Sequence, residues 1–331
     1  MPLHPRRRLI RAAAAIPLAA AALPRPALSQ GAADGYPTRP VRVIAPYSPG
    51  GQTDTVIRLL APRMQEALGQ PIVVENRTGA GGTIGAGVVA QAPADGHTLL
   101  FESFAFVVAP LIAKGLTFDY ETAFIPVVQA VTLPYVLVVR RDFPPPHTVP
   151  GFVAAAKRSP GVTYGTPGIG SAGHLAGALL AHRAGIRMEH VAYRGGQDAA
   201  RDVIAGNIDA AISTANTLRP LVEEGRAHGI GLTSIDRRGS LARLPTIAET
   251  YPDFDITSWN GLFAPAGTPA PALAKLNAAV RHATRDPEIA RRLTQTGNEP
   301  MDQDAEAFQA RVRRDRETVK RIVAETGLKL D

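Results

Sequence analysis

The sequence predicts an α/β fold of two lobes, each a mixed, mostly parallel sheet flanked by helices, with a ligand cleft between the lobes. Apolar runs typical of strands alternate with runs of helical length over most of the chain, a pattern that indicates right-handed crossovers and doubly wound sheets. The alternation starts twice, and each half carries a small-residue loop between a strand and a helix, at 46–54 and at 164–174. A length of 331 residues also favours two domains.

The first half contains three predicted strands joined by helices. The strands are the apolar runs at 41–45, 71–75 and 98–101. A helix is predicted over 53–68, and a second helix follows the glycine-rich segment 79–87 and ends near residue 92.

The second half repeats the pattern and then returns. Strands are predicted at 136–139, 162–164, 190–193 and 208–212, with helices at 149–157, 172–183 and 199–205. A strand at 259–264 is expected to rejoin the first lobe, which arginine-rich helices within 271–326 would cover. The chain would therefore cross between lobes near 134–139 and 255–262, giving lobe 1 as 36–135 plus 258–331 and lobe 2 as 136–257. Ligands of open α/β sheets bind in clefts at such junctions.

The N-terminus has the layout of a cleavable signal peptide over residues 1–29. An arginine-rich start is followed by an apolar run at 12–23, too short for a stable anchor, and by Ala27-Leu28-Ser29. The run Arg6-Arg7-Arg8 resembles a twin-arginine motif, although Pro5 replaces the usual Ser or Thr. We expect export to the periplasm with cleavage near Ser29, by the twin-arginine or the general route.

Charge and cysteine content narrow the possible partners. The formal net charge is +7, but five of the 36 basic residues lie in the first 29 residues. Removing them leaves 31 basic against 29 acidic residues, so the expected mature chain is only +2. This argues against nucleic acid or an anionic membrane surface as a partner. With no cysteine in the sequence, disulfides and lipid-modified cysteine are excluded.

Both small-residue loops suit an anion. Glycine lets the backbone approach a ligand closely, and the helix that follows directs free N–H groups and a positive dipole end toward it. Tight turns and helix caps would account for the same residues, with Thr53 or Asp54 capping the first helix and Ser171 the second. An N-cap hydroxyl can do both, because it faces the space in which an anion would lie.

Four segments, in order, resemble one known family: the periplasmic solute-binding proteins of tripartite tricarboxylate transport systems, or Bug family. They are Asn-Arg-Thr-Gly-Ala-Gly-Gly at 76–82, Ala-Asp-Gly-His-Thr-Leu at 94–99, His-Val-Ala-Tyr-Arg-Gly at 190–195 and the run from Trp259 to Thr268. The resemblance covers almost the whole mature chain. It implies a type II-like periplasmic-binding-protein fold without catalytic residues, cofactor or metal. It also implies lobe closure on a small organic acid, and a monomer that serves membrane permease subunits or a sensor.

The resemblance also implies site residues. The second lobe's loop would hold a ligand carboxylate through Thr166, Gly170, Ser171 and Ala172. Waters anchored by the first loop would bridge to the ligand, a role that falls to Tyr47, Ser48, Gly50, Gly51 and Asp54. Ser103, Gly168, His174 and Asp198 complete the candidate set. His174 lies one turn into a helix on its more apolar face, which is typical of a structural histidine.

The chain departs from the family pattern where specificity is expected. Glu102 and Phe104 follow the third strand, where relatives have small polar residues, and Asp198 replaces a common proline. Glu102 would repel a second ligand carboxylate and so suits an amino or hydroxyl group; alternatively it is a solvated loop acid or pairs with Arg77. Phe104 and Phe106 either stack on an aromatic acid or belong to the core.

An exported NAD(P)-dependent oxidoreductase is the alternative. Gly168, Gly170 and Gly173 satisfy the spacing of a dinucleotide fingerprint, and Glu189 lies 21 residues after the first of them. However, the fingerprint lies inside the second lobe rather than after the first strand of a domain. The segment also lacks the Gly-x-Ser-x-Gly order of a hydrolase, and no spacing typical of metal ligands is found.

Overall fold

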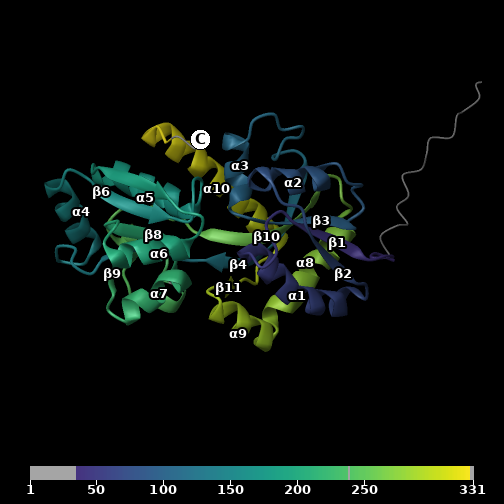
Figure 1. Ribbon diagram of the computed structural model, residues 1–331. Coiled ribbons are helices and arrows are strands. Elements are labelled where there is room, and N and C mark those ends of the chain that lie inside the picture. The colour runs from purple at the N-terminus through teal and green to yellow at the C-terminus, as the bar shows by residue number, and fades with distance from the viewer. Residues whose placement is uncertain (1–34, 238, 329–331) are drawn as a thin grey trace, which may run out of the picture.

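A computed structural model describes residues 35–237 and 239–328. The predicted signal peptide at 1–29 lies outside the described residues. Figure 1 shows the remaining chain as two lobes side by side, each a sheet with helices packed on it. Within the described ranges, no helix combines the length and apolar character needed to cross a bilayer.

Lobe 1 is built on a six-stranded sheet with the strand order β11-β4-β10-β3-β1-β2. Its strands are β1 (Val41–Ala45), β2 (Ile72–Asn76), β3 (Thr98–Ser103), β4 (Phe124–Leu133), β10 (Ser258–Pro265) and β11 (Glu299–Pro300). Its helices are α1 (Gln52–Leu68), α2 (Thr83–Ala90), α3 (Ala105–Ile112), α8 (Ala270–Arg285) and α9 (Pro287–Gln295).

Lobe 2 has a five-stranded sheet in the order β7-β6-β8-β5-β9. The strands are β5 (Tyr135–Arg140), β6 (Val162–Thr166), β7 (Met188–Ala192), β8 (Ala210–Thr214) and β9 (Ala227–Leu232). They alternate with α4 (Val149–Arg158), α5 (Ala172–Ala184), α6 (Gly196–Ala205) and α7 (Ala215–Glu223).

Both sheets are mixed, as predicted, but they contain more antiparallel pairs than the strand–helix alternation implies. Strand β1 is parallel to β2 and β3, whereas β10 is antiparallel to β3 and β4. In lobe 2, β6 is parallel to its neighbours and β5 is antiparallel to β8 and β9. The two long antiparallel strands, β5 and β10, each follow a lobe crossing, because a chain arriving from the other lobe enters the sheet at its opposite end; the short β11 is antiparallel to β4 as well.

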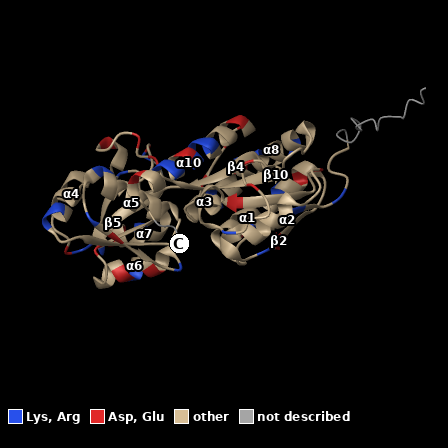
Figure 2. Ribbon diagram, turned by 90° about the horizontal axis from the view of Figure 1, so that it is seen from above, with Lys and Arg blue, Asp and Glu red and all other residues tan. Residues whose placement is uncertain are grey.

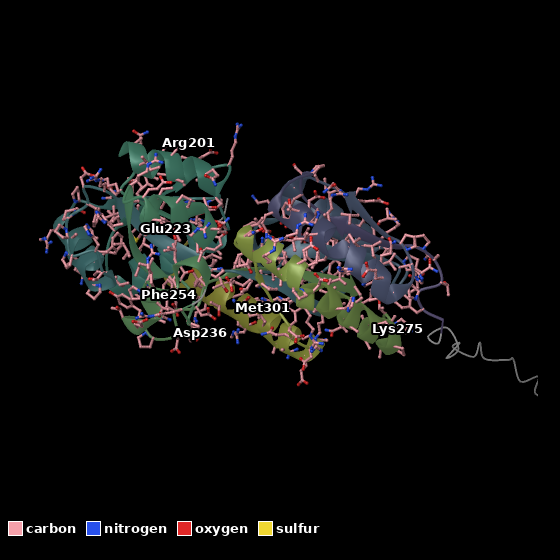
Figure 3. All side chains as sticks on the ribbon, turned by 90° about the horizontal axis from the view of Figure 1, so that it is seen from below. Arg201, Glu223, Asp236, Phe254, Lys275 and Met301 are labelled. Atoms are coloured by element: carbon pink, nitrogen blue, oxygen red, sulfur yellow. The ribbon has the colours of Figure 1, made fainter. Side chains whose placement is uncertain are left out.

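The two lobes are joined by β4 and β5, which meet at Pro134, and by the segment leading from β9 to β10. The last helix, α10 (Ala305–Thr326), packs on β4 of lobe 1 and on α5 of lobe 2. Figure 3, seen from below, places Arg201 and Glu223 on lobe 2, Lys275 on lobe 1 and Met301 between the lobes.

The core of lobe 1 is aromatic where β10 passes beneath α3 and α10. Phe106 of α3 is buried and stacks on Phe263 with ring centroids 4.1 Å apart. Phe308 of α10 meets Trp259 edge-on at 5.3 Å. This packing confirms the core interpretation of Phe106.

A buried polar cluster fixes α10 to β10 and to the segment between the lobes. The Trp259 indole N–H donates to Asp315 at 2.8 Å. The Arg311 guanidinium donates to the same carboxylate at 2.7 Å and to the Thr257 hydroxyl at 2.8 Å. It also lies 3.7 Å from Asp255. The cluster therefore connects the last helix to both sides of the second crossing.

Candidate functional site

A cleft of about 640 Å³ lies between the lobes and takes its wall from both of them. This volume is within the range of about 300–1,000 Å³ typical of small-molecule sites. The wall comes mainly from the loops that follow β1, β3, β6 and β8, so it lies at the carboxyl ends of strands, as expected for open α/β sheets.

Five helices begin at this wall, among them α3, whose N-cap Phe104 and first residue Ala105 lie on it. The backbone N–H groups of Gln52 and Thr53 in α1, Ala172 in α5 and Gly196 in α6 have no acceptor among the described residues. Another helix, α7, starts at Thr214, which also lies on the wall. Free N–H groups and positive dipole ends therefore converge on one space, which suits a bound anion.

The wall itself carries no formal charge. None of its described lining residues is Asp, Glu, Lys, Arg or His. Hydroxyl groups from both lobes provide its polar surface, and Val108, Ile112, Leu133 and Ile169 provide apolar surface. Figure 2 shows charged residues along α10 and on outer helices such as α4 and α6. The attraction for an anion therefore comes from the backbone and hydroxyls rather than from an arginine or lysine.

The loop before α5 is held from behind by a histidine. Ser171 is the N-cap of α5 and accepts a hydrogen bond from the His174 N–H at 3.3 Å. The Gly170 N–H, which the resemblance assigned to the ligand, instead donates to His174 Nδ1 at 3.2 Å. Gly170 has φ +72° and lies against Val108 of lobe 1, so the loop also touches the opposite lobe.

His174 and His190 form a stacked pair behind this loop, with ring centroids 3.8 Å apart. His190 Nε2 lies 2.7 Å from the Thr166 hydroxyl. Burial, together with the neighbouring His190, lowers the pKa of His174 to about 4, and burial lowers the pKa of His190 to about 4. The structural interpretation of His174 is confirmed, because its ring is buried and orders the loop.

We expect stability to fall as the pH is lowered from about 6.5 to about 4, because the unfolded chain takes up protons that the folded histidine pair excludes. The contribution of the histidine pair to stability is complete above about pH 6.5 and is lost as the pH falls from there to about 4. Thermal melting between pH 4.5 and 7.5 measures the slope. Because carboxylates also titrate near the lower end, the same series on His190→Gln isolates the pair and should show a shallower slope; equal slopes would contradict the assignment.

The first loop is shaped by Asp54, which points away from the cleft. Its buried carboxylate accepts from the Gly50 N–H at 2.8 Å, from Asn76 at 2.8 Å and from Arg58 at 2.8 Å. Asn76 also donates to the Tyr47 carbonyl at 2.9 Å. Burial would raise the pKa of Asp54, but these hydrogen bonds outweigh it and the pKa is lowered. Asp54 therefore positions the loop that places Tyr47 at the wall.

The structure separates the predicted site residues into two groups. Those on the wall are Tyr47, Ser48, Gly51, Ser103, Phe104, Gly168, Gly170, Ser171 and Ala172. Those off the wall are Gly50, Asp54, Glu102, Thr166, His174 and Asp198. Asp198 lies in the first turn of α6 and pairs with Arg201, while its neighbour Gly196 is on the wall.

Neither of the two structural interpretations of Glu102, a solvated loop acid or a partner of Arg77, is correct. Its side chain is buried, with 2% of the residue exposed, so it is not a solvated loop acid. Arg77 pairs with Glu75 at 3.2 Å instead. Phe104 is also buried, contacts Trp259 edge-on at 6.4 Å and presents part of its surface to the cleft.

Several wall residues were not predicted. They are Gln52, Thr53, Tyr135, Ser213, Thr214, Thr217 and Ser258. The Ser213-Thr214 pair offered a usable signal, because it ends a strand and begins a helix as the two glycine loops do. This segment lacks the glycines from which the other two loops were predicted to be binding loops.

Two lobes, a cleft at the strand ends and an uncharged wall of helix N-termini define a two-lobed solute-binding protein. The family described as tripartite tricarboxylate transporter family receptor matches residues 56–328. This chain belongs to that family, as the resemblance implied.

Individual relatives agree with this assignment. The chain is 39% identical, over 80% of its length and 79% of the relative's, to a protein from the tcbD–tcbE intergenic region of Pseudomonas sp. strain P51. The solved periplasmic binding protein BugD is 32% identical with a TM-score of 0.71, over 89% of this chain and 99% of BugD. MatC from Rhodopseudomonas palustris with bound malate is 30% identical with a TM-score of 0.69, over 87% of this chain and 100% of MatC.

The oxidoreductase alternative has no support from these findings. Glu189 pairs with Thr163 at the start of the parallel strands β6 and β7, whereas the glycine loop follows the end of β6. The acidic residue of the fingerprint is therefore at the wrong end of the sheet to reach a ribose held at that loop.

Proposed function

We propose that this protein captures a small organic carboxylate between its lobes and presents it to a membrane transport system, without catalysing a reaction. One observation carries the proposal: the free N–H groups of α1, α5 and α6 converge on a cleft whose wall bears no charged side chain. Such a wall favours an anion without the cost of burying a counter-charge. The malate bound to MatC supports a carboxylate as the anion.

The proposal extends to the cellular setting. We also propose that the signal peptide at 1–29 directs export and is cleaved near Ser29. The mature protein then works as a monomer with permease subunits or a sensor. No cofactor or metal is required by this function. Among residues 35–237 and 239–328, no cluster of three or more His, Asp or Glu could hold a metal ion.

The proposed lobes, 36–135 with 258–331 and 136–257, would close on the ligand. The separate sheets support this division, because each takes its strands from one of them. The lobes approach closely at two glycines: a Cβ at Gly170 would lie 3.0 Å from Val108, and one at Gly297 would lie 2.1 Å from Asn216. A ligand bound to both lobes would stabilise this arrangement over an open one.

A thermal-shift screen of the refolded, ligand-free mature protein tests the function. We expect stabilisation by one class of small carboxylate, since a ligand at 100 times its Kd adds about 2.7 kcal/mol. The panel contains organic acids, amino acids and NAD(P). Stabilisation by NAD(P) alone, or by no carboxylate, would refute the proposal.

Replacing Ser171 with alanine should weaken binding of the stabilising carboxylate by about 0.5–1.5 kcal/mol, or more if the hydrogen bond is charge-assisted. Isothermal titration calorimetry measures the change. The variant also loses the cap of α5, which costs about 1 kcal/mol of stability.

Thr148→Ala is the matched control, because Thr148 caps α4 by accepting from the Gly151 N–H at 3.2 Å, away from the cleft. It should lose similar stability and bind normally. If Ser171→Ala bound as tightly as Thr148→Ala, Ser171 would have no role in the site.

A further inference from the structure

Glu102 is a buried acid directly beneath the cleft wall. Its carboxylate accepts from the Ser103 N–H at 2.6 Å and from the Ser103 hydroxyl at 3.0 Å. The Tyr47 hydroxyl lies on the other side, 3.3 Å from Ser103 Oγ. A Cβ at Gly82 would lie 3.0 Å from Glu102 Oε2 and 3.3 Å from the Tyr47 hydroxyl, so glycine leaves room for this group. Ser103 and Tyr47 form the wall, and Glu102 does not reach it.

The chemistry of these groups fixes the direction of their hydrogen bonds. An ionised carboxylate only accepts, whereas a hydroxyl has one hydrogen to donate and two lone pairs. The single Ser103 hydrogen is directed to Glu102, so in the 3.3 Å contact between the two hydroxyls Tyr47 is the donor to Ser103 Oγ, and its hydrogen also points inward. Ser103 Oγ also accepts from the Ala105 N–H at 3.3 Å, so the lone pairs that this part of the wall offers to a ligand are those of the Tyr47 hydroxyl.

We propose that Glu102 is a specificity-determining positioning residue: through Ser103 and Tyr47 it turns this part of the cleft into a hydrogen-bond acceptor, so the ligand carries a hydroxyl or ammonium group there. This inference rests on the proposed function, in which the ligand's carboxylate lies at the helix N-termini. It adds the chemistry of the other end of the ligand.

Charge works in the same direction as hydrogen bonding. The buried carboxylate has no cation in contact with it, because its partners are the neutral Ser103 and Tyr47. The described wall residues supply no Lys or Arg that could offset it. A second ligand carboxylate at this part of the wall would be separated from the Glu102 carboxylate by little more than one hydroxyl group. The low local dielectric would make the repulsion between the two charges strong.

Protonation of Glu102 reverses this preference. Burial is the main cause that raises the pKa of Glu102, to about 7, while the Ser103 and Tyr47 hydrogen bonds oppose it. The titratable groups that face it are Tyr47 and Tyr120, both of which have pKa values raised by burial and by Glu102, so they stay neutral. A protonated Glu102 donates a hydrogen to a neighbouring hydroxyl, which frees that hydroxyl to donate into the cleft. A dicarboxylate is then accepted.

The test measures the affinity of three probes of similar length: 4-hydroxybutyrate, 4-aminobutyrate and succinate. Isothermal titration calorimetry at pH 8 and pH 6 compares the wild-type protein with Glu102→Gln. The histidine pair, with pKa values of about 4, stays neutral at both pH values. Glu75→Gln is the matched control, since Glu75 is an acid of the same lobe that pairs with Arg42 at 2.9 Å outside the cleft wall.

At pH 8 we expect the wild-type protein to prefer at least one of the two donor-bearing acids to succinate by tenfold or more. The preference should shrink severalfold at pH 6. Glu102→Gln should lose the preference at pH 8 and show the same selectivity at both pH values, because its amide donates a hydrogen permanently. Glu75→Gln should behave as the wild type does.

The fold of the variant is checked independently. A raised carboxyl pKa means that the folded state holds a proton which the unfolded state releases between pH 4.5 and about 7, so this group destabilises the wild type as the pH rises through that window. Glu102→Gln should therefore melt no lower than the wild type at pH 8. If it fails to fold, Ser103→Ala, which removes the hydroxyl that connects Glu102 to Tyr47, should reduce the preference instead.

The outcomes separate the two proposals. If the wild type binds carboxylates but shows no preference for donor-bearing acids at pH 8, or if Glu102→Gln keeps the wild-type selectivity, the inference is wrong and the proposed function stands. The same holds if the thermal-shift screen at pH 8 finds only carboxylates without a hydroxyl or amino group. If no carboxylate binds to any variant, the proposed function itself fails.

Discussion

Replacing Gly170 with valine should weaken carboxylate binding by about a hundredfold or more, equivalent to at least about 2.7 kcal/mol. The residue has φ +72°, where a β-branched side chain costs about 1–3 kcal/mol of strain. Its Cβ would lie 3.0 Å from Val108 Cγ1, so the added methyl groups would also hold the lobes apart. Calorimetric titration with the carboxylate found in the screen measures the loss.

Gly69→Val separates strain from function. Gly69 ends α1 with φ +69°, and a Cβ there would meet no atom within 4 Å. Both variants should lose similar stability, but only Gly170→Val should lose affinity. Equal affinities in the two variants would show that the loop does not take part in closure or binding.

Removing the carboxylate of Asp315 should destabilise the protein by up to about 3–5 kcal/mol, because Asp315→Ala takes from Arg311 its hydrogen-bonded carboxylate and leaves it only Asp255, 3.7 Å away. The Arg311 side chain is only 14% exposed, and the Trp259 indole N–H would lose its acceptor. Urea unfolding of the mature protein measures the change.

Two control variants test whether the stability loss comes from the buried cluster. Asp315→Asn retains an acceptor for Trp259 and should lose less stability than the alanine variant. Asp302→Ala breaks exposed pairs with Arg281 and Arg285, which should cost no more than about 1 kcal/mol. A loss below 1 kcal/mol for Asp315→Ala would mean that the buried cluster does not stabilise the crossing between lobes.

Strands β1, β2, β3 and β10 of the first lobe and most helices could be predicted because their patterns are local. The run at 41–45 is apolar throughout, as a central strand buried on both faces requires, and β1 has the predicted bounds. Helix α5 begins at a capping serine and ends at Gly185 with φ +61°, so both of its ends have sequence signals.

Two elements of lobe 1 were missed for a physical reason. Helix α3 reads Ala-Phe-Val-Val-Ala-Pro-Leu-Ile, with apolar residues on every face and a proline inside. Because even its partly exposed positions carry apolar residues such as Leu111, it has no amphipathic period to detect. Strand β4 has a proline at its third position and contains Gln129, which is buried all the same.

The site could be predicted only in part. The sequence indicates which loops lie near the cleft, but it does not indicate in which direction their side chains point. Asp54 follows a glycine loop and looks available to a ligand, but three internal donors occupy its carboxylate. A role of Glu102 in specificity stays a prediction; its burial beneath Ser103 could not be predicted, because it depends on α2 and Gly82, which are distant in sequence. Whether these residues bind ligand stays a prediction.

The backbone origin of the anion site has a consequence for how such receptors diversify. An N–H group at a helix start is present with any residue except proline, so random substitution at Gln52 or Ala172 leaves the donor in place. The wall of lobe 1 is made of side chains such as Ser103 and Phe104, which substitution changes directly. A duplicated gene could therefore acquire a new substrate by mutations in such side chains, while the backbone donors of both lobes, in α1 as well as in α5 and α6, continue to bind the carboxylate.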